Sequence, residues 1–383
     1  MKFEKSRKNL IIFPKGKIDS TNSQEVEQEI FEVCEKNNGF EQLILDFSNV
    51  EYISSAGLRV ILRIKQKYDK LTVVEVPLEV YDTFSMTGFT ELMEIRKALR
   101  KVDISNAKVI GDGFFSTVYR LDGDTIVKVF NRTSDPHQID RELKLAKQAF
   151  VLGIPTALSF DVVKVGDKLG VVFEMLDCNS LKTVVTEHPD KAEYYANKYV
   201  ELLKKINTTV CTSPEIPKMK KHYQEKVEKI RPVLGEEYYL KAKHVIDNIE
   251  DRSTFIHGDC HFKNIMVQGD ELLLIDMDTL SVGHPIFEFA QLYAPYCAFE
   301  EDEPGNTKTF LGIEPEFARQ LFDTLLSRYL GKEDPVIYDK IRLVCYIHMV
   351  WWTMVNQPDN KTRLEGSKGR LLSLLDKYDD VNF

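Results

Sequence analysis

The sequence has no apolar run long enough to cross a membrane or to direct export. The most apolar stretch of its C-terminal part, Val344–Val355, is shorter than the about 20 residues that a membrane helix needs, and it contains His348. Near the N-terminus, Leu10–Phe13 stops at Pro14 and falls short of the about 7 residues of a signal-peptide core. We therefore expect a buried core helix at 344–355, no export and no membrane partner.

Cysteine is scarce, and basic charge is not in excess. The six cysteines are dispersed without a C-x-x-C pair, which argues against a zinc site or a redox motif and indicates a reduced, cytoplasmic protein. The chain has 51 basic and 60 acidic residues, a net charge of −9, and its first 104 residues hold 16 of the basic and 17 of the acidic ones. Nucleic acid is not an expected partner, because its binding usually requires a basic surface.

The composition is that of a globular protein, with 43% hydrophobic and 29% charged residues over 383 positions, enough for two or three domains of about 100–200 residues each. Up to about residue 100, short β-type runs alternate with helical patterns, which is typical of a β/α domain with a mostly parallel sheet. We expect this domain over residues 1–98 and a polar linker over 99–107. The expected strands are 9–13, 42–47, 71–76 and 93–96, and the expected helices are 23–36, 56–70 and 79–86.

The rest of the chain predicts two lobes. A three-strand meander, an amphipathic helix and two more strands indicate a small β-rich lobe over 108–177. Residues 178–383 are mostly helical, apart from a strand-rich segment at 256–275. The expected helices are 190–207, 218–234, 237–250, 315–329, 335–356 and 361–378. A β-lobe followed by an α-lobe is the arrangement of a bilobal kinase.

Two features of the small lobe suggest a phosphate site. The loop between its first two strands carries small residues at Gly111, Gly113 and Ser116, which let backbone N–H groups approach phosphates. Downstream, Lys128 interrupts an apolar strand, where a lysine requires a partner. Glu142, on the following helix, is the candidate partner. A surface lysine on an edge strand and a solvated glutamate are the alternative.

The strongest chemical signal is FIHGDCHFKN at 255–264, followed by an apolar strand and by DMD at 276–278. Phosphoryl transfer needs a carboxylate near the attacking hydroxyl and hard oxygen ligands for Mg²⁺. Asp259 fits the first role, and Asn264 and Asp276 fit the second. Zinc binding by the histidines and cysteine of the first motif is one alternative, although no further Cys or His cluster completes four ligands. A plain loop is another.

Together these motifs resemble the aminoglycoside phosphotransferase and choline kinase family, which has an α+β, bilobal protein-kinase-like fold. The resemblance covers roughly residues 105–383 and implies ATP and Mg²⁺ as cofactors. Lys128 would hold the α- and β-phosphates, oriented by Glu142. Glu174 and Leu176, at the end of the last small-lobe strand, would belong to the hinge whose backbone meets adenine.

The same resemblance implies roles around the phosphates. Asp259 would act as catalytic base, and His257 would brace the catalytic loop. Asn264 and Asp276 would coordinate Mg²⁺, with Asp278 as an additional ligand.

The segment after these residues favours a small-molecule acceptor. Only seven residues separate Asp276 from HPIF at 284–287, which leaves no room for the peptide-docking activation segment of protein kinases. Glu288 stands where the family more often has Asp, so the reach of a carboxylate that braces the catalytic loop would change. The acidic run 300–303 would attract a cationic acceptor, or else it is a solvated loop.

The N-terminal domain has its own motif. VEYISSAGLRV at 50–60 links a buried strand to a helix, with Ser54 and Ser55 at the N-cap position. With GKID at 16–19 and TGF at 87–89, it resembles a STAS domain of the anti-sigma-factor-antagonist type, an α/β fold. Ser55 then matches the phosphorylatable serine of that family, where phosphate adds about two negative charges at a helix N-terminus. Ser54 replaces the usual Asp, and plain helix capping is the alternative.

The sequence therefore predicts an ATP- and Mg²⁺-dependent phosphotransferase that acts on a small-molecule hydroxyl of the aminoglycoside, amino alcohol or sugar type. Its STAS-like domain would regulate it or dock a protein partner. Two alternatives remain: a protein kinase that acts on STAS-type serines, and a pseudokinase scaffold that binds partners without turnover.

Overall fold

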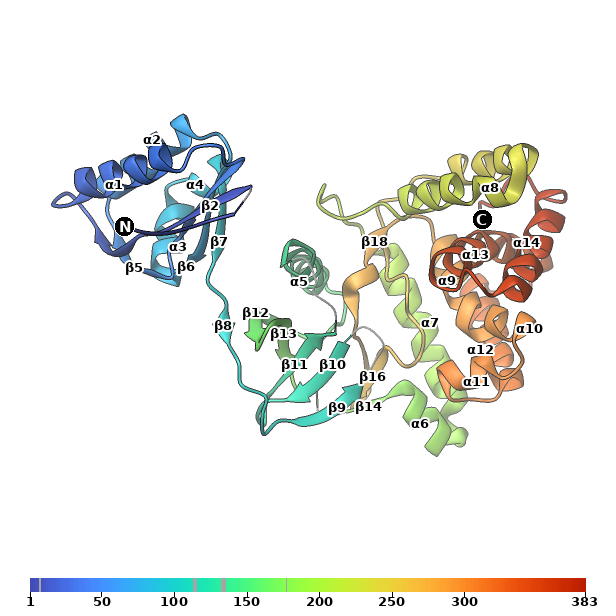
Figure 1. Cartoon of the computed structure of the whole chain (residues 1–383). Coiled ribbons are helices and arrows are strands. Elements are labelled where there is room, and N and C mark those ends of the chain that lie inside the picture. Colours follow the sequence, from blue (N-terminus) through green and yellow to red (C-terminus); the bar gives the residue numbers. More distant parts are fainter. Residues whose placement is uncertain (7, 113–115, 132–135, 177) are drawn as a thin grey trace. The chain divides into compact units, whose positions relative to one another are not determined.

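The computed structural model describes residues 1–6, 8–112, 116–131, 136–176 and 178–383, without the side chains of 136–138 and 140–142. The chain folds as two compact units, Met1–Asp103 and Ile104–Phe383. The division between them falls inside the segment predicted as a linker. Figure 1 shows the elements of both units.

Unit 1 is a mixed α/β domain built on a five-stranded sheet with the order β1, β2, β4, β6, β7. The strands are β1 (Lys2–Lys5), β2 (Asn9–Phe13), β4 (Gln42–Asp46), β6 (Leu71–Val76) and β7 (Glu94–Lys97). β1 is antiparallel to β2, and the other neighbours are parallel. A second sheet pairs β3 (Lys15–Ile18) with β5 (Asn49–Ile53) in parallel.

The helices of unit 1 are α1 (Ser23–Lys36), α2 (Ser55–Lys67), α3 (Leu78–Met86) and α4 (Phe89–Leu92). Strands β2 and β4 bury alternate residues, as the sequence pattern predicts, so that one face of each strand enters the core. Ile30 of α1 and Ile61 and Ile64 of α2 are fully buried in the same core. Gly57 is needed on α2, because a Cβ there would lie 2.5 Å from the carbonyl oxygen of Ile18.

The smaller lobe of unit 2 is an antiparallel sheet in which β12, β13, β11, β10 and β9 lie side by side in that order. The strands are β9 (Lys108–Asp112), β10 (Ser116–Arg120), β11 (Thr125–Phe130), β12 (Ser159–Val165) and β13 (Lys168–Glu174); a short strand, β8 (Arg100–Lys101), precedes them in the chain. Helix α5 (Pro136–Val151) packs on β12 and also contacts η2 (Met277–Thr279), a 3-10 turn of the larger lobe. The small lobe is thereby tied to the segment that carries DMD.

The larger lobe is mostly helical. Its short strands flank the loop at 257–264, which contains the predicted catalytic base and is called the catalytic loop below. Its helices are α6 (Leu181–Glu187), η1 (Pro189–Lys191), α7 (Ala192–Thr208), α8 (Met219–Asp247), α9 (Ile286–Tyr293), η3 (Ala294–Ala298), α10 (Phe299–Asp302), α11 (Asn306–Leu311), α12 (Pro315–Leu330), α13 (Pro335–Asn356) and α14 (Lys361–Leu375). Its strands are β14 (Asn179–Ser180), β15 (Phe255–Ile256), β16 (Ile265–Gln268), β17 (Glu271–Leu274) and β18 (Ser281–Val282). Non-helical angles at Gly235 interrupt α8 between the two helices that the sequence predicts there.

Helix α13 contains the apolar run 344–355 and lies in the core of the larger lobe. Val344, Ile347 and Val350 are fully buried, and α13 packs against α8, α9 and α14. This agrees with the predicted core helix. Among the described residues, no helix is both long and apolar enough to span a membrane.

Candidate active site

Gly258 allows the catalytic-loop segment to turn between β15 and β16. Its φ of 80° lies in the left-handed region, which other residues rarely adopt. A Cβ at this position would lie 3.0 Å from Cε of Met219 and 3.2 Å from the carbonyl oxygen of Thr279. Glycine is therefore required both by the backbone conformation and by the close packing of α8 and η2 against the loop.

Glu288, in the first turn of α9, holds this loop in place. Its side chain is fully buried, Oε2 accepts a hydrogen bond from the N–H of His257 at 2.7 Å, and Oε1 accepts one from the N–H of Gly258 at 3.1 Å. Burial raises the pKa of Glu288 to about 7, and the two backbone hydrogen bonds oppose that rise. The glutamate side chain thus reaches the loop, although the family that the sequence resembles more often has aspartate at this position.

His257 connects the loop to the strand that leads to Asp276. Its ring is fully buried, Nε2 lies 3.2 Å from the carbonyl oxygen of Ile275, and Nδ1 accepts the N–H of Asp259 at 3.2 Å. Burial lowers the pKa of His257 to about 4, so the imidazole is neutral at pH 7. A neutral ring protonated on Nε2 satisfies both contacts, which supports the bracing role expected for His257.

Asp259 and Asn264, near the two ends of the catalytic loop, have side chains in contact. Oδ2 of Asp259 accepts a hydrogen bond from Nδ2 of Asn264 at 3.0 Å, while 43% of the Asp259 side chain is exposed. Burial, followed by the charges of Asp276 and Asp278, raises the pKa of Asp259 above its usual range. The charges of Asp276 and Asp278 thus act on Asp259 in the same direction as burial, and a cation bound beside Asp276 and Asp278 would favour the charged form of Asp259.

Asp276 receives the lysine of the small lobe. Nζ of Lys128, on β11, lies 2.5 Å from Oδ1 of Asp276, so this contact joins the two lobes. The backbone of Asp276 has a φ of 65°, which is uncommon for a residue other than glycine and is found mostly at functional positions. Glu142, the partner first expected for Lys128, lies on α5, but its side chain is outside the described part of the structure.

The oxygen donors near Asp276 suit Mg²⁺. The N–H of Ile275 donates to the carbonyl oxygen of Asn264 at 3.0 Å, which places Asn264 directly beside the strand end that carries Asp276. Asp278 follows in η2 and is exposed. Two carboxylates and an amide are hard oxygen ligands, and Mg²⁺ commonly completes its shell with water and substrate phosphates. Among the residues that the structure describes, no group of three His, Cys, Asp or Glu side chains could hold a metal ion, so the zinc alternative gains no support.

The phosphate-loop candidates are only partly covered by the structure. Gly111 lies in β9, one residue before its end, opposite Val118, and a Cβ on it would meet that side chain at 3.5 Å, an ordinary contact. The packing of the chain itself therefore does not require glycine here. Ser116 begins β10, whereas Gly113 lies outside the described residues.

The hinge candidates lie where β13 leaves the small lobe. The carboxylate of Glu174 accepts the N–H of Leu158 at 2.6 Å, and the N–H of Glu174 donates to the carbonyl oxygen of Leu158 at 2.9 Å. Leu176 follows and is half-buried. The side chain of Glu174 is thus engaged within the small lobe, so a contact with adenine would involve the backbone, as the resemblance implies.

Three residues that the sequence gave no reason to select also hold the loop. The hydroxyl of Tyr199 donates to the carbonyl oxygen of Cys260, and the hydroxyl of Tyr296 accepts the N–H of Phe262 at 3.0 Å. Thr279 donates to the carbonyl oxygen of His257 at 2.6 Å. The two tyrosines are buried in helical segments, where their sequence pattern is that of ordinary core residues.

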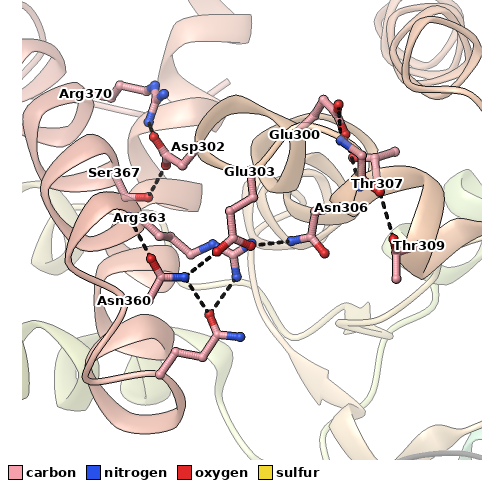
Figure 2. A network of polar contacts seen from close by, with 12 residues as sticks. Glu300, Asp302, Glu303, Asn306, Thr307, Thr309, Asn360, Arg363, Ser367 and Arg370 are labelled. Carbon is pink, nitrogen blue, oxygen red and sulfur yellow. Dashed lines mark hydrogen bonds and ion pairs between the residues drawn. The ribbon is translucent and has the colours of Figure 1, made fainter.

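The carboxylates of the acidic run 300–303 have partners within the chain, and Figure 2 shows those of Glu300, Asp302 and Glu303. Nη1 of Arg370, on α14, lies 2.8 Å from Oδ1 of Asp302, and Ser367 donates to Oδ2 of Asp302 at 3.2 Å. Glu303 accepts hydrogen bonds from the buried Arg363 and from Asn360.

The other two members of the run are engaged as well. Glu300 accepts the N–H groups of Gly305 and Thr307, at 2.6 and 3.2 Å. Glu301 accepts the hydroxyl of Tyr293 at 2.9 Å and that of Tyr346 at 2.6 Å. The run is therefore a network that fastens α10 to α13 and α14, which differs from both roles considered from the sequence.

Ser54 and Ser55 of unit 1 have different surroundings. The hydroxyl of Ser54 accepts the N–H of Ala56 at 3.1 Å and that of Gly57 at 3.4 Å, so Ser54 is the N-cap of α2. Ser55 is the first helical residue and is exposed. The capping role thus falls on Ser54.

Comparison with known proteins gives a match for each unit. The model of the phosphotransferase enzyme family matches residues 106–321, and the model of the STAS domain matches residues 1–102. BtrV of Bordetella bronchiseptica, whose name describes an anti-sigma factor antagonist, is 31% identical over 90 residues, which are 22% of this chain and 76% of that protein.

Solved structures similar to the chain include two aminoglycoside phosphotransferases. The gentamicin complex of APH(2")-IIa is 16% identical, with a TM-score of 0.47, over 73% of this chain and 94% of that one. The ADP-bound structure of APH(2")-Ib is 16% identical, with a TM-score of 0.48, over 73% of this chain and 95% of that one.

Proposed function

The chain belongs to the phosphotransferase enzyme family and carries an N-terminal STAS domain, and from this we propose that unit 2 transfers the γ-phosphoryl group of ATP to a hydroxyl of a small molecule. The acceptor would be of the sugar, amino alcohol or aminoglycoside type. The observation that carries the proposal is that Lys128, from the small lobe, contacts Asp276 of the larger lobe, whose charge also acts on Asp259.

Each of these residues has a role in the proposed reaction. Asp259 accepts the proton of the acceptor hydroxyl while the hydroxyl oxygen attacks the γ-phosphorus. The bond between the γ-phosphorus and the bridging oxygen breaks, and ADP leaves with that oxygen. Lys128 binds the nucleotide phosphates in exchange for its contact with Asp276. Asn264, Asp276 and Asp278 would hold Mg²⁺, which neutralises phosphate charge when it is bound. His257 and Glu288 keep Asp259 in position.

Nucleotide binding tests the proposal and separates it from the scaffold alternative. ATP with Mg²⁺ should raise the melting temperature of the full chain, since a ligand at 100 times its Kd stabilises by about 2.7 kcal/mol. Asp276→Ala should abolish the dependence on Mg²⁺. No thermal shift with any nucleotide would favour the pseudokinase scaffold. A screen of sugars, amino alcohols, amines and aminoglycosides for ATP-dependent phosphorylation would then define the acceptor.

A protein kinase that acts on STAS-type serines is the second candidate, because Ser55 is exposed at the start of α2. We expect Ser55 not to be a substrate of its own chain, and the STAS domain to recruit a protein partner. Wild type and Asp259→Asn should be incubated with ATP and Mg²⁺ at several dilutions, and phosphate located by mass spectrometry. Stoichiometric phosphate on Ser55 in the wild type alone, at a rate independent of dilution, would instead establish the protein-kinase activity.

A further inference from the structure

Two lysine side chains lie at the C-terminal end of α11, beside the catalytic loop. Nζ of Lys263, in the loop itself, donates to the carbonyl oxygen of Phe310 at 2.9 Å. Nζ of Lys182, in the first turn of α6, lies 3.3 Å from the place where a Cβ of Gly312 would be. Burial lowers the pKa of Lys263, the charge of Lys182 adds to this effect, and the charge of Asp259 opposes it.

This pair of lysines is connected to Asp259 through the loop. Lys263 is the fourth residue after Asp259, and the N–H of Lys182 donates to the carbonyl oxygen of Phe262 at 3.2 Å. The ring of Phe310, 38% exposed, lies 5.0 Å from Nζ of Lys263 and packs edge-on against His261. The pair therefore belongs to the surroundings of the catalytic base.

No described carboxylate forms an ion pair with either lysine. The nearby Asp259 is bonded to Asn264, and the four carboxylates of the run 300–303 are bonded to other groups. His261, only 4% exposed, adds a ring nitrogen, Nδ1, that has no hydrogen-bond partner within the described structure. An ammonium group has three N–H donors, so the contact with Phe310 leaves two of those of Lys263 for a ligand.

Two neighbouring positive charges repel each other, and the one carboxylate whose charge acts on Lys263, that of Asp259, is already bonded to Asn264. An additional anionic ligand would reduce the repulsion. A cationic acceptor, in contrast, would approach two like charges. We propose that the acceptor carries an anionic group, a carboxylate or a phosphate, which Lys182 and Lys263 bind while its hydroxyl faces Asp259. This inference rests on the proposed phosphotransferase function. Of the acceptor types named there, it favours sugars that carry an acid or a phosphate over the cationic ones, and it adds hydroxy acids.

The experiment compares neutral and anionic probes of similar size on the full chain. Glycerol, D-glycerate, glycerol 3-phosphate and inorganic phosphate are titrated by calorimetry into protein saturated with Mg²⁺ and a non-hydrolysable ATP analogue, so that the nucleotide phosphate site is already filled. We expect D-glycerate or glycerol 3-phosphate to bind at least ten-fold more tightly than glycerol. Preference for glycerate identifies a carboxylate as the recognised group. Preference for glycerol 3-phosphate, with competition by inorganic phosphate, identifies a phosphate.

The variant Lys182→Met/Lys263→Met should reduce this preference to less than two-fold, with the affinity for the ATP analogue unchanged within two-fold. Lys164→Met, at an exposed lysine of β12, is the matched control and should keep the preference.

Three outcomes would overturn the inference. They are equal binding or no binding of all probes by the wild type, a preference that survives in the double variant, and a loss of nucleotide affinity in the double variant. Lower stability of the double variant with the preference retained would mean that the lysines only cap α11. Failure of the wild type to bind the ATP analogue would reject the proposed function itself, whereas nucleotide binding without anion preference would reject this inference alone.

Discussion

The larger lobe contains two groups of acidic side chains that differ in the partners of their carboxylates. The first group is Asp259, Asp276 and Asp278. Burial, followed by the charges of the other two, raises the pKa of Asp259, and Lys128 pairs with Asp276. The second is the run 300–303, whose carboxylates are bonded to arginines, hydroxyls and backbone N–H groups. Figure 2 shows the contacts of Glu300, Asp302 and Glu303. In the first group, the ion pair of Asp276 joins the two lobes of unit 2, whereas the second group is held by partners within the larger lobe.

The difference shows that the partners of a carboxylate decide its function more than the local density of acidic residues does. Asp302 is only 7% exposed and faces Arg370, an arrangement in which loss of either partner leaves a buried charge. Asp259 is 43% exposed and accepts a hydrogen bond from a neutral amide. The following changes test this contrast, from the largest expected effect to the smallest.

Asp259→Asn should lower kcat for an acceptor found in the screen by about 10²–10⁴, because the amide keeps the shape of the side chain but cannot accept the hydroxyl proton. The affinity for Mg²⁺ and ATP should stay nearly unchanged. Steady-state kinetics and calorimetry on the same preparation separate the two effects. Full activity of the variant would remove Asp259 from the mechanism.

Glu288→Gln should remove a pH dependence of stability that the buried carboxylate causes. The folded-state pKa of about 7 lies above the ordinary value of 4.5, so Glu288 stabilises the fold most when protonated, and this contribution is lost as the pH rises toward 7. Between pH 5 and pH 8, the unfolding free energy of the wild type should fall by about 2 kcal/mol relative to the variant. Urea unfolding at a series of pH values measures this difference, and parallel curves for the two proteins would contradict it.

Gly366→Ala should destabilise the protein by about 1–2 kcal/mol, because a Cβ at this position of α14 would lie 2.0 Å from Oδ1 of Asp302 and displace it from Arg370. Gly369→Ala, three residues along the same helix, is the matched control. A Cβ there has nothing within 4 Å, and alanine favours the helix by up to about 1 kcal/mol. Thermal unfolding should therefore shift in opposite directions for the two variants. Equal shifts would mean that the contact with Asp302 contributes little.

The order of the elements could be predicted from the sequence because it depends on local patterns. The β/α alternation of unit 1, the β-lobe of unit 2 and the break of α8 at Gly235 follow from hydrophobic periodicity and from glycine. The candidate residues for phosphoryl transfer could also be selected, since Asp259, Asn264 and Asp276 stand in motifs whose spacing phosphoryl transfer requires.

Side-chain partners between distant segments could not be predicted in the same way. Sequence patterns assign Tyr199 and Tyr296 to the core, but not to the hydrogen bonds that hold the catalytic loop. Nothing in the order of residues shows that Lys263 would reach the end of α11 or that Lys182 would lie beside it.

By itself, then, the sequence predicted the two units, the order of their main elements and the candidate residues for phosphoryl transfer, because backbone propensity, apolar periodicity and motif spacing are local properties. The tertiary structure alone decided which partner each charged side chain has. Asp302 and Asp276 are both aspartates in acidic segments, yet one faces Arg370 from α14 and the other faces Lys128 from β11. Coulomb interactions and desolvation depend on distance and burial, and packing fixes both only after distant segments have come together.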